Sequence, residues 1–536
     1  MGSIQVSHLG WSLPGGRMLL DDVGFRVGEG EHAALVGANG AGKSTIMRLV
    51  AGTETAAEGT ISVQGSMGVM TQLVGSLDEA VTARDLYVSL ASTEIREAAT
   101  RLADAESQMV AGTDDGMKYA KALDRWGGIG GYDEEVRWEE CAHRVTGRSW
   151  TEVADRSMAT FSGGEQKRMA LEYLLRSEHE VLLLDEPDNF LDVPGKEWLA
   201  ERLRESAKTI LYVSHDRELL AATSDKVITI EAHGAWTHGG SFATWREARE
   251  HRLELANDEQ RRWAEERKRL VRHMREQKRR AAMSDANASR ARAAETRLRH
   301  FDDEGPPPEA AKDQRIEMRL AGGRTGKRVV VAEQLELTDL TFPFDLEIWF
   351  GERVAVVGRN GTGKSHFLRL LGQWTGEEVD PACPVAHEGS WKLGARVVPG
   401  LFNQTHDQPE LVGRTVLEIL ADRHLARGPA MSRLRRYELQ GQADQAWETL
   451  SGGQQARFQI LLLEIDGANL LLLDEPTDNL DVASAEALEA GLEVFEGTVV
   501  CVTHDRWFLR SFDRFVAFTG DNEVVELDDP ADAWAS

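Results

Sequence analysis

Cysteine is scarce in this chain, and long apolar runs are absent. Its three cysteines, Cys141, Cys383 and Cys501, lie far apart, which argues against a disulfide framework, a zinc knuckle or an iron–sulfur cluster and fits a reducing compartment. No apolar run approaches the ~18 residues that cross a bilayer. The first residues lack the basic segment and apolar stretch of a secretory signal. The sequence therefore predicts a soluble cytoplasmic protein without a membrane partner.

Basic residues are also outnumbered by acidic residues, except in one segment. The 536 residues include 62 Lys and Arg against 89 Asp and Glu, a net charge of −27, which argues against coating nucleic acid with the whole surface. Residues 246–300, however, contain 17 basic and 10 acidic side chains, so this segment carries +7 and the remainder −34. The net charge therefore does not exclude a nucleic-acid contact through one basic element on an acidic body.

The rest of the chain is a repeat. GANGAGKS at 37–44 recurs as GRNGTGKS at 358–365, FSGGEQ at 161–166 as LSGGQQ at 450–455, and LLLDEPDNFLD at 182–192 as LLLDEPTDNLD at 471–481. From the SGG motif to the SHDR and THDR motifs, the two copies keep a constant offset of 289 residues. Gln72 and Gln404, each on a strand-like run, place an extra helical insertion in the first copy, within roughly 85–147.

Each copy is typical of an α/β domain, and the segment between them is typical of a helical hairpin. Short apolar runs such as VLLLD and TILYVS alternate with helix-length segments, which indicates buried parallel strands. The basic segment has almost no glycine, and an interruption at 284–287 divides it into two helices. We therefore predict domains at 1–242, 243–325 and 326–536, with the hairpin linker in the middle.

The glycine-rich loops carry the most specific chemistry. Both match GxxxxGK[ST] between a strand and a helix, where backbone N–H groups and the helix N-terminus bind phosphates. Lys43 and Lys364 are expected to reach the β- and γ-phosphates, and the hydroxyls of Ser44 and Ser365 are expected to bind Mg²⁺. A tight strand–helix turn with a chance lysine is the simpler alternative, but it does not account for two copies.

Carboxylates and histidines follow other apolar strands, so they should reach the same sheet edge. Asp185 and Asp474 are predicted to bind Mg²⁺, and Glu186 and Glu475 to orient and deprotonate the attacking water. His215 and His504 are expected at this edge, near the γ-phosphate.

With its SGG motifs, the sequence resembles the ATP-binding-cassette (ABC) ATPases over both halves. The resemblance implies two cassettes within one monomer that face each other head to tail, with two ATP molecules between them. It implies catalytic roles for Glu186, Glu475, His215 and His504, and Mg²⁺ binding through Ser44, Gln72, Asp185, Ser365, Gln404 and Asp474. The implied ATP-binding residues are Gly37, Asn39, Gly40, Gly42, Lys43, Ser44, Thr45, Gln72, Ser162, Gly163, Gly164, Gly358, Asn360, Gly361, Gly363, Lys364, Ser365, Gln404, Ser451, Gly452 and Gly453.

Some positions depart from the family pattern. DEPTNxLD is typical, but Asp188 replaces its threonine in the first copy and Asp478 replaces its asparagine in the second. His366 stands where a second hydroxyl is usual. The residue that stacks on adenine stays open between Trp11 and Leu13 in the first copy, and between Phe342 and Phe344 in the second.

The basic linker and the inserted arm resemble those of the ABC-F subfamily. This resemblance implies binding to the bacterial 70S ribosome at the E site, with the hairpin near the P-site tRNA and rRNA and with ribosomal proteins nearby. It implies displacement of peptidyl-transferase and exit-tunnel antibiotics, with ATP hydrolysis driving release. A solvated helix with the ion pairs Glu265/Arg269 and Glu276/Arg280 is the simpler view of the linker.

The functional alternatives are a housekeeping ABC-F translation factor and an ATPase subunit of a drug-efflux transporter. A DNA-repair ATPase would carry zinc cysteines or long coiled coils inside its cassette, and a recycling factor would carry a cysteine-rich cluster domain; neither pattern is present.

Overall fold

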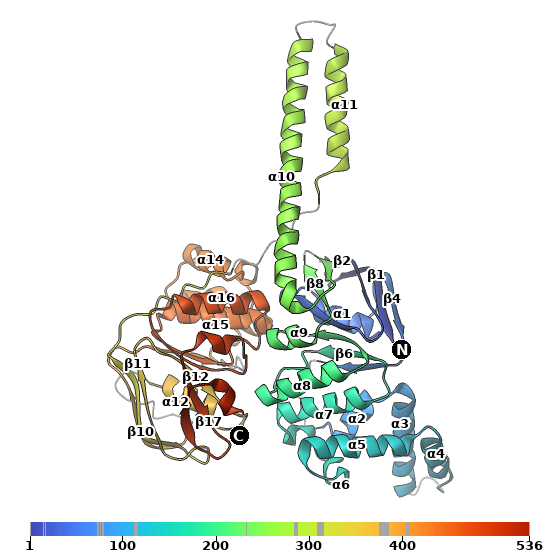
Figure 1. The fold of residues 1–536 in the computed structure, drawn as a ribbon, viewed down its shortest axis with the longest axis vertical. Helices are drawn as coiled ribbons and strands as arrows, with labels where there is room; N and C mark the ends of the chain where they lie inside the picture. Colours follow the sequence, from blue (N-terminus) through green and yellow to red (C-terminus); the bar gives the residue numbers. More distant parts are fainter. Residues whose placement is uncertain are drawn as a thin grey trace. The chain divides into compact units, whose positions relative to one another are not determined.

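The computed structural model describes residues 2–534 except 14, 17, 72–73, 75–76, 78–79, 112–115, 232, 283–287, 308–315, 375–384 and 404–407. The chain divides into two compact units. The larger unit combines Met1–Gly239 with Gln314–Ser536 and holds both copies of the repeat, whereas the smaller unit is Gly240–Asp313. Two tandem α/β cassettes joined by a helical hairpin, the predicted fold, are confirmed (Figure 1).

The first cassette is built on two sheets. A three-stranded antiparallel sheet has the order β2-β1-β4, and a six-stranded sheet has the order β5-β6-β7-β3-β8-β9 within the described residues. Their strands are β1 Ser3–Ser12, β2 Met18–Val27, β3 His32–Gly37, β4 Glu58–Gln64, β5 Met67–Met70, β6 Val181–Asp185, β7 Thr209–Val213, β8 Lys226–Glu231 and β9 Gly234–His238. All five residues of β6 and of β7 are buried, as expected for parallel strands covered on both faces.

Helices fill the remainder of this cassette. They are α1 Lys43–Val50, α2 Ala83–Leu90, α3 Thr93–Val110, α4 Met117–Gly128, α5 Gly131–Thr146, α6 Trp150–Val153, α7 Gly163–Arg176, α8 Val193–Glu205 and α9 Arg217–Thr223. The range 85–147, expected to hold the inserted arm, contains most of α2 and all of α3, α4 and α5. Tyr87, Trp126, Trp138, Trp150 and Tyr173 pack ring against ring, with neighbouring centroids 5.4–6.5 Å apart. This aromatic cluster anchors α5 on α2 and α7.

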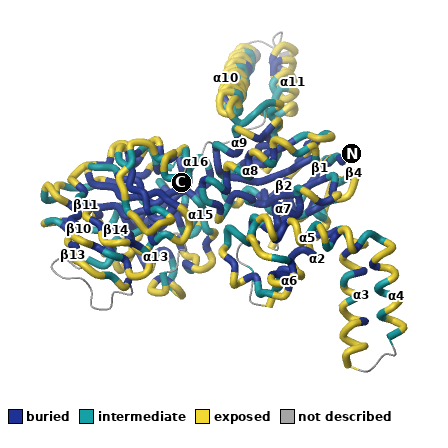
Figure 2. The backbone as a smooth tube through the Cα atoms, turned by 60° about the horizontal axis from the view of Figure 1, so that its bottom comes forward, coloured by how far each residue is buried: buried dark blue, intermediate teal, exposed yellow. Residues whose placement is uncertain are grey.

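Within its described residues, the second cassette repeats the plan without the arm. Its described sheets have the orders β11-β10-β13 and β14-β15-β16-β12-β17-β18. Their strands are β10 Arg328–Leu337, β11 Phe344–Trp349, β12 Arg353–Val357, β13 His387–Leu393, β14 Pro399–Phe402, β15 Leu470–Asp474, β16 Thr498–Val502, β17 Arg514–Phe518 and β18 Val524–Leu527. The helices are α12 Lys364–Gly372, α13 Val416–Asp422, α14 Arg427–Arg436, α15 Gly452–Asp466 and α16 Val482–Glu493. Buried residues of the two cassettes follow these strands, the dark blue segments of Figure 2.

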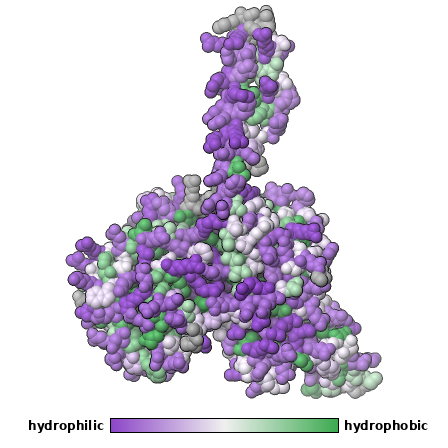
Figure 3. All heavy atoms as spheres, in the orientation of Figure 1, coloured by the Kyte–Doolittle hydropathy of each residue, from purple (hydrophilic) through white to green (hydrophobic). Residues whose placement is uncertain are grey.

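The smaller unit is a pair of helices, α10 Phe242–Ala281 and α11 Ala288–Glu304. The predicted turn at 284–287 lies outside the described residues. A narrow apolar seam joins the helices, with Leu253 and Leu270 buried and the rings of Trp263 and Phe301 stacked 5.5 Å apart. Hydrophilic residues cover most of the visible face of the hairpin (Figure 3).

Ion pairs lie along the surface of the hairpin, and one of the two predicted pairs is among them. Arg280 pairs with Glu276 at 2.5 Å, but Arg269 pairs with Glu266 at 2.6 Å and not with Glu265. Both glutamates are within reach of Arg269, because residues three apart on a helix are neighbours just as residues four apart are.

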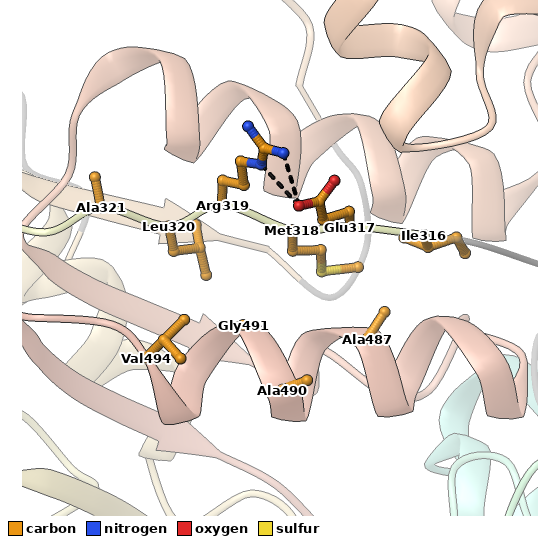
Figure 4. A pocket seen from close by; sticks show the side chains of 10 residues that line it. All are labelled: Ile316, Glu317, Met318, Arg319, Leu320, Ala321, Ala487, Ala490, Gly491 and Val494. Atoms are coloured by element: carbon orange, nitrogen blue, oxygen red, sulfur yellow. Dashed lines mark hydrogen bonds and ion pairs between the residues drawn. The ribbon is translucent and has the colours of Figure 1, made fainter.

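Residues after the hairpin join the larger unit. Met318 and Leu320 are buried in the core of the second cassette, so the predicted linker, 243–325, extends past the smaller unit. Residues 316–321 and α16 line a groove of about 430 Å³ (Figure 4). None of the predicted site residues lines it. In the described part of the chain, no helix is both long and apolar enough to cross a membrane.

Candidate nucleotide-binding sites

The phosphate loops connect a central strand to a helix in each cassette. In the first, β3 ends at Gly37 and α1 begins at Lys43; in the second, β12 is followed by α12, which begins at Lys364. Gly42 and Gly363 directly precede the helices with φ of 102° and 98°, the left-handed conformation that glycine adopts without strain. The strand and the helix N-terminus thus fix a backbone loop suited to phosphate.

The loop lysines lie over their own loops. The Nζ atoms of Lys43 and Lys364 donate to the carbonyl oxygens of Gly37 and Gly358, both at 2.8 Å. Burial lowers the pKa of Lys43, and lowers that of Lys364 to about 8, because a buried ammonium loses its hydration. Nearby carboxylates oppose this shift. These side chains are therefore desolvated cations aimed at the loop.

The predicted Mg²⁺ ligands meet in pairs. Asp185 and Asp474 end β6 and β15, and the hydroxyl of Ser365 donates to Asp474 Oδ1 at 2.9 Å. Burial raises the pKa of Asp185, the neighbouring Ser44 hydroxyl opposes this shift, and Asp185 Oδ1 is buried without a hydrogen-bond partner among the described residues. Hydroxyl and carboxylate oxygens are the hard donors that Mg²⁺ prefers, so both pairs fit the ion. Gln72 and Gln404, predicted as further ligands, lie outside the described residues.

Glu186 and Glu475 follow these aspartates in an unusual backbone conformation. Their φ angles are 49° and 48°, in the left-handed region, where strain is typical of functional sites. Asn189 Nδ2 donates to Glu186 Oε2 at 2.8 Å. Glu475 instead accepts from the backbone N–H of His504 at 3.0 Å. Burial, with help from Asp478 and Asp474, raises the pKa of Glu475 to about 8. The two carboxylates are thus held by different neighbours.

The two histidines are neutral near pH 7. Burial and the Lys43 ammonium lower the pKa of His215 to about 3, and burial with Lys364 and Lys196 lowers the pKa of His504 well below its usual value. His504 Nε2 lies 3.0 Å from Oδ1 of Asn360 and 3.4 Å from Oε1 of Glu475. The second site therefore joins its phosphate loop, its histidine and its glutamate directly.

The SGG motifs begin helices α7 and α15. Ser162 and Ser451 are the N-caps, and each forms a capping box, with Glu165 in the first cassette and Gln454 in the second. Gly163 and Gly452 follow as the first helical residues. Backbone N–H groups at a helix N-terminus can bind phosphate, so each SGG helix offers a second candidate phosphate-binding surface.

Each SGG motif faces the phosphate loop of the other cassette. A Cβ atom at Gly453 would lie 2.0 Å from Asn39 Nδ2, and one at Gly164 would lie 3.9 Å from Asn360 Nδ2. Asn39 also donates from Nδ2 to the Asn479 carbonyl at 3.0 Å, and Asn360 Nδ2 donates to the Phe190 carbonyl at 3.2 Å. The predicted residues other than the two glutamines thus gather into two composite sites between the cassettes. Thr45 is buried in α1, where its hydroxyl accepts from Arg48 at 3.2 Å.

The structure distinguishes between the two adenine-stacking candidates of the second cassette. Phe344 is buried against Phe367 and Phe518, so it belongs to the core. Phe342 is 58% exposed and can meet a base, whereas Trp11 and Leu13 are both partly buried. His366 is exposed on α12.

Sequence reasoning missed several contributors. Asp481 caps α16 and also accepts from the backbone N–H of Asn39 in the other cassette at 2.8 Å. Lys167, fully buried, donates to the Glu186 carbonyl at 2.9 Å. Asp481 ends the LLLDEPTDNLD motif just before a helix, so an N-cap pattern could have identified it. Lys167 has no such local signal.

Comparisons with known proteins agree with this geometry. The ABC transporter family model matches residues 20–189 and 342–478. The chain is 49% identical to "Antibiotic resistance protein" of Mycobacteroides abscessus, over 99% of this chain and 100% of that one. It is 32% identical to the tylosin resistance ATP-binding protein TlrC of Streptomyces fradiae, over 91% and 92% of the two chains.

More distant relatives cover nearly the whole chain. ABC transporter F family member 2 of Arabidopsis thaliana is 28% identical over 96% of this chain and 75% of its own. Among solved structures, the archaeal ribosome recycling factor aABCE1 in complex with stalk protein aP1 has a TM-score of 0.54 at 18% identity, covering 95% of this chain and 87% of that one. This last likeness concerns the fold.

Proposed function

Because the chain belongs to the ABC-F subfamily of ATP-binding-cassette ATPases, we propose that it binds the bacterial 70S ribosome in an ATP-dependent manner and confers antibiotic resistance. It enters the E site in the ATP-bound form, displaces drugs from the peptidyl-transferase centre or exit tunnel, and leaves after hydrolysis. The observation that carries the resistance assignment is the full-length similarity to an antibiotic resistance protein.

The ATPase chemistry of each site is divided between the cassettes. Lys43 or Lys364 binds the phosphates from one side, and the SGG helix N-terminus of the opposite cassette binds them from the other. Glu186 or Glu475 orients and deprotonates the water, and the neutral His215 or His504 holds the γ-phosphate as a hydrogen-bond donor. Bound Mg²⁺, held by Ser44 and Asp185 or by Ser365 and Asp474, would neutralise phosphate charge.

The head-to-tail contacts support coupling between ATP and binding. Since each site needs residues of both cassettes, ATP stabilises the closed arrangement, and hydrolysis weakens it. The basic hairpin supports an RNA contact, because 15 of its 17 basic side chains in 246–300 are arginines, whose planar guanidinium suits phosphate.

Sedimentation tests ribosome binding. The variant Glu186→Gln with Glu475→Gln should bind ATP without hydrolysing it and should pellet with 70S ribosomes when ATP is present. The same variant with Lys43→Ala and Lys364→Ala is the control that should stay in the supernatant. If the ATP-loaded glutamine variant also stays in the supernatant, ribosome binding is wrong.

Inhibitory concentrations test resistance. Expression in a susceptible strain should raise these concentrations for at least one peptidyl-transferase or exit-tunnel drug. A ribosome-binding protein that shifts none of them would be the housekeeping translation factor. A shift without ribosome binding would favour the ATPase subunit of an efflux transporter.

Charge reversal tests the hairpin. Arg275, Arg279 and Arg280 lie near the end of α10, and replacing all three with Glu should abolish protection while ATP binding persists. The matched control replaces the same three with Lys, which keeps the charge. Protection that survives the Glu variant would show that these side chains do not carry the RNA contact.

A further inference from the structure

Two buried lysines distinguish the first cassette from the second. With the offset of 289 residues that relates the cassettes from the SGG motif onward, Lys167 corresponds to Ala456 and Lys196 to Ala485. Asp188 corresponds to Thr477, so the first cassette also has a buried acid where the second has a neutral side chain. Lys167 is 0% and Lys196 6% exposed. Burying an ammonium is unfavourable unless it is paired, so each lysine should have a specific task.

Lys167 acts within its own cassette. Its Nζ donates to the carbonyl of Glu186 at 2.9 Å, and the carboxylates that attract it are Asp188, Glu186 and Asp185, all from the first site. In the second cassette Ala456 leaves Glu475 without this cation.

Lys196 lies on α8 of the first cassette but reaches the second site. Its Nζ is 3.2 Å from Asp216 Oδ2 and donates to the backbone carbonyl of His504 at 3.5 Å. Asp478 and Asp505, both of the second cassette, also attract this ammonium, as does Asp188 of its own. One cation thus lies among four carboxylates, two from each cassette.

The surrounding charges show why the cation is needed. Glu475, Asp474 and Asp478 repel one another in a desolvated space, and Lys196 and Lys364 are the cations that oppose this repulsion. Arg217, the first residue of α9, and Arg506, in the loop after β16, face the same region, but Arg217 binds Glu489 and Asp505, and Arg506 binds Glu197. Lys196, which donates to the His504 carbonyl, is therefore the cation that supports the His504–Glu475 pair.

We propose that Lys196 is a positioning residue of the second ATP site, supplied in trans by the first cassette, and that the first site has no equivalent. The proposal rests on the ATPase function proposed above. Lys196 holds the loop of His504, whose N–H and ring in turn hold Glu475. Because the ammonium belongs to the opposite cassette, the second site acquires its active geometry only when the cassettes are closed.

Single-site enzymes test this assignment. In purified full-length protein with Mg²⁺ and ATP, Glu186→Gln leaves the second site active, and Glu475→Gln leaves the first. Adding Lys196→Met should lower kcat of the second site about tenfold with KM changed less than about twofold, since misplaced catalytic groups slow chemistry more than binding. The first site should lose several times less activity.

Lys167→Met is the matched control, because it removes an equally buried lysine. It should give the opposite pattern, with the larger loss at the first site. If Lys196→Met lowers kcat equally at both sites, its role is structural and the proposal is wrong. The proposal is also wrong if the substitution leaves kcat of the second site unchanged. If Lys196→Met does not fold, Lys196→Gln, which removes the charge but keeps a hydrogen-bond donor, is read by the same criteria. Wild-type protein without ATPase activity would instead refute the proposed function.

Discussion

The two nucleotide sites share their motifs but differ in how their catalytic groups are held. At the first site, Asn189 of the same loop contacts Glu186, and Lys167 of the same cassette binds its carbonyl. At the second site, Glu475 and His504 contact each other, Asn360 joins them to the phosphate loop, and Lys196 arrives from the opposite cassette. One site is supported locally and the other depends more on closure, so identical motifs do not imply identical behaviour.

The largest effect is expected when both general bases are removed. Glu186→Gln with Glu475→Gln should lower kcat by about 10²–10⁴-fold, because the amide cannot accept the proton from water. Each single variant isolates the turnover of the other site and so measures the difference between them directly. A double variant that keeps wild-type turnover would show that neither carboxylate is the base.

Breaking a buried contact between the cassettes should have the next largest effect. The side chain of Arg217 is 3% exposed and contacts Glu489 and Asp505 of the second cassette. Arg217→Ala should destabilise the closed arrangement by about 2 kcal/mol, since it leaves two partly buried carboxylates unpaired. Denaturant titration of the ATP-loaded protein measures the loss.

Arg506 is the matched control, 289 residues further on. Its side chain is 27% exposed and pairs with Glu197, which is 57% exposed, at 3.1 Å. Arg506→Ala should therefore change stability by less than about 1 kcal/mol. Equal effects of the two substitutions would contradict the asymmetric interface.

The phosphate-loop asparagines sharpen the same comparison at a smaller scale. Both asparagine side chains bond across the interface, Asn360 to the Phe190 carbonyl and Asn39 to the Asn479 carbonyl, but Asn360 also contacts His504. Asn360→Ala should lower turnover at the second site more than Asn39→Ala lowers it at the first, by about 1 kcal/mol or fivefold, the worth of one hydrogen bond. Rates in the single-site glutamine backgrounds give the comparison.

An exposed pair in the hairpin should give the smallest effect. Arg267 bonds to Asp302 at 2.8 Å, with side-chain exposures of 46% and 36%. Arg267→Ala should destabilise the hairpin by less than about 1 kcal/mol and leave ATPase activity unchanged. A fall in ATPase activity would show that this pair matters to the cassettes.

The repeated motifs were sufficient to predict the cassettes, because glycine loops, strand-end acids and SGG caps act over a few residues. The paired helices of the linker followed from the scarcity of glycine and the interruption at 284–287. Lys196 and Arg217 could not be predicted, because their partners, His504 and Glu489, are about 300 residues away and meet them only across the interface. Arg269 shows the same limit locally, since both Glu265 and Glu266 are in helical reach.

The capping boxes differ in charge, and this gives the two sites unequal sensitivity to salt. The Ser162 box contains the carboxylate of Glu165, whereas the Ser451 box contains the neutral amide of Gln454. The first of these helices faces the second phosphate loop, so a fixed negative charge lies on the side where a triphosphate binds there. Mobile ions screen such repulsion over a Debye length of about 8 Å at physiological ionic strength. Rising ionic strength should therefore relieve this repulsion at the second site alone, and ATP affinity there should gain relative to the first.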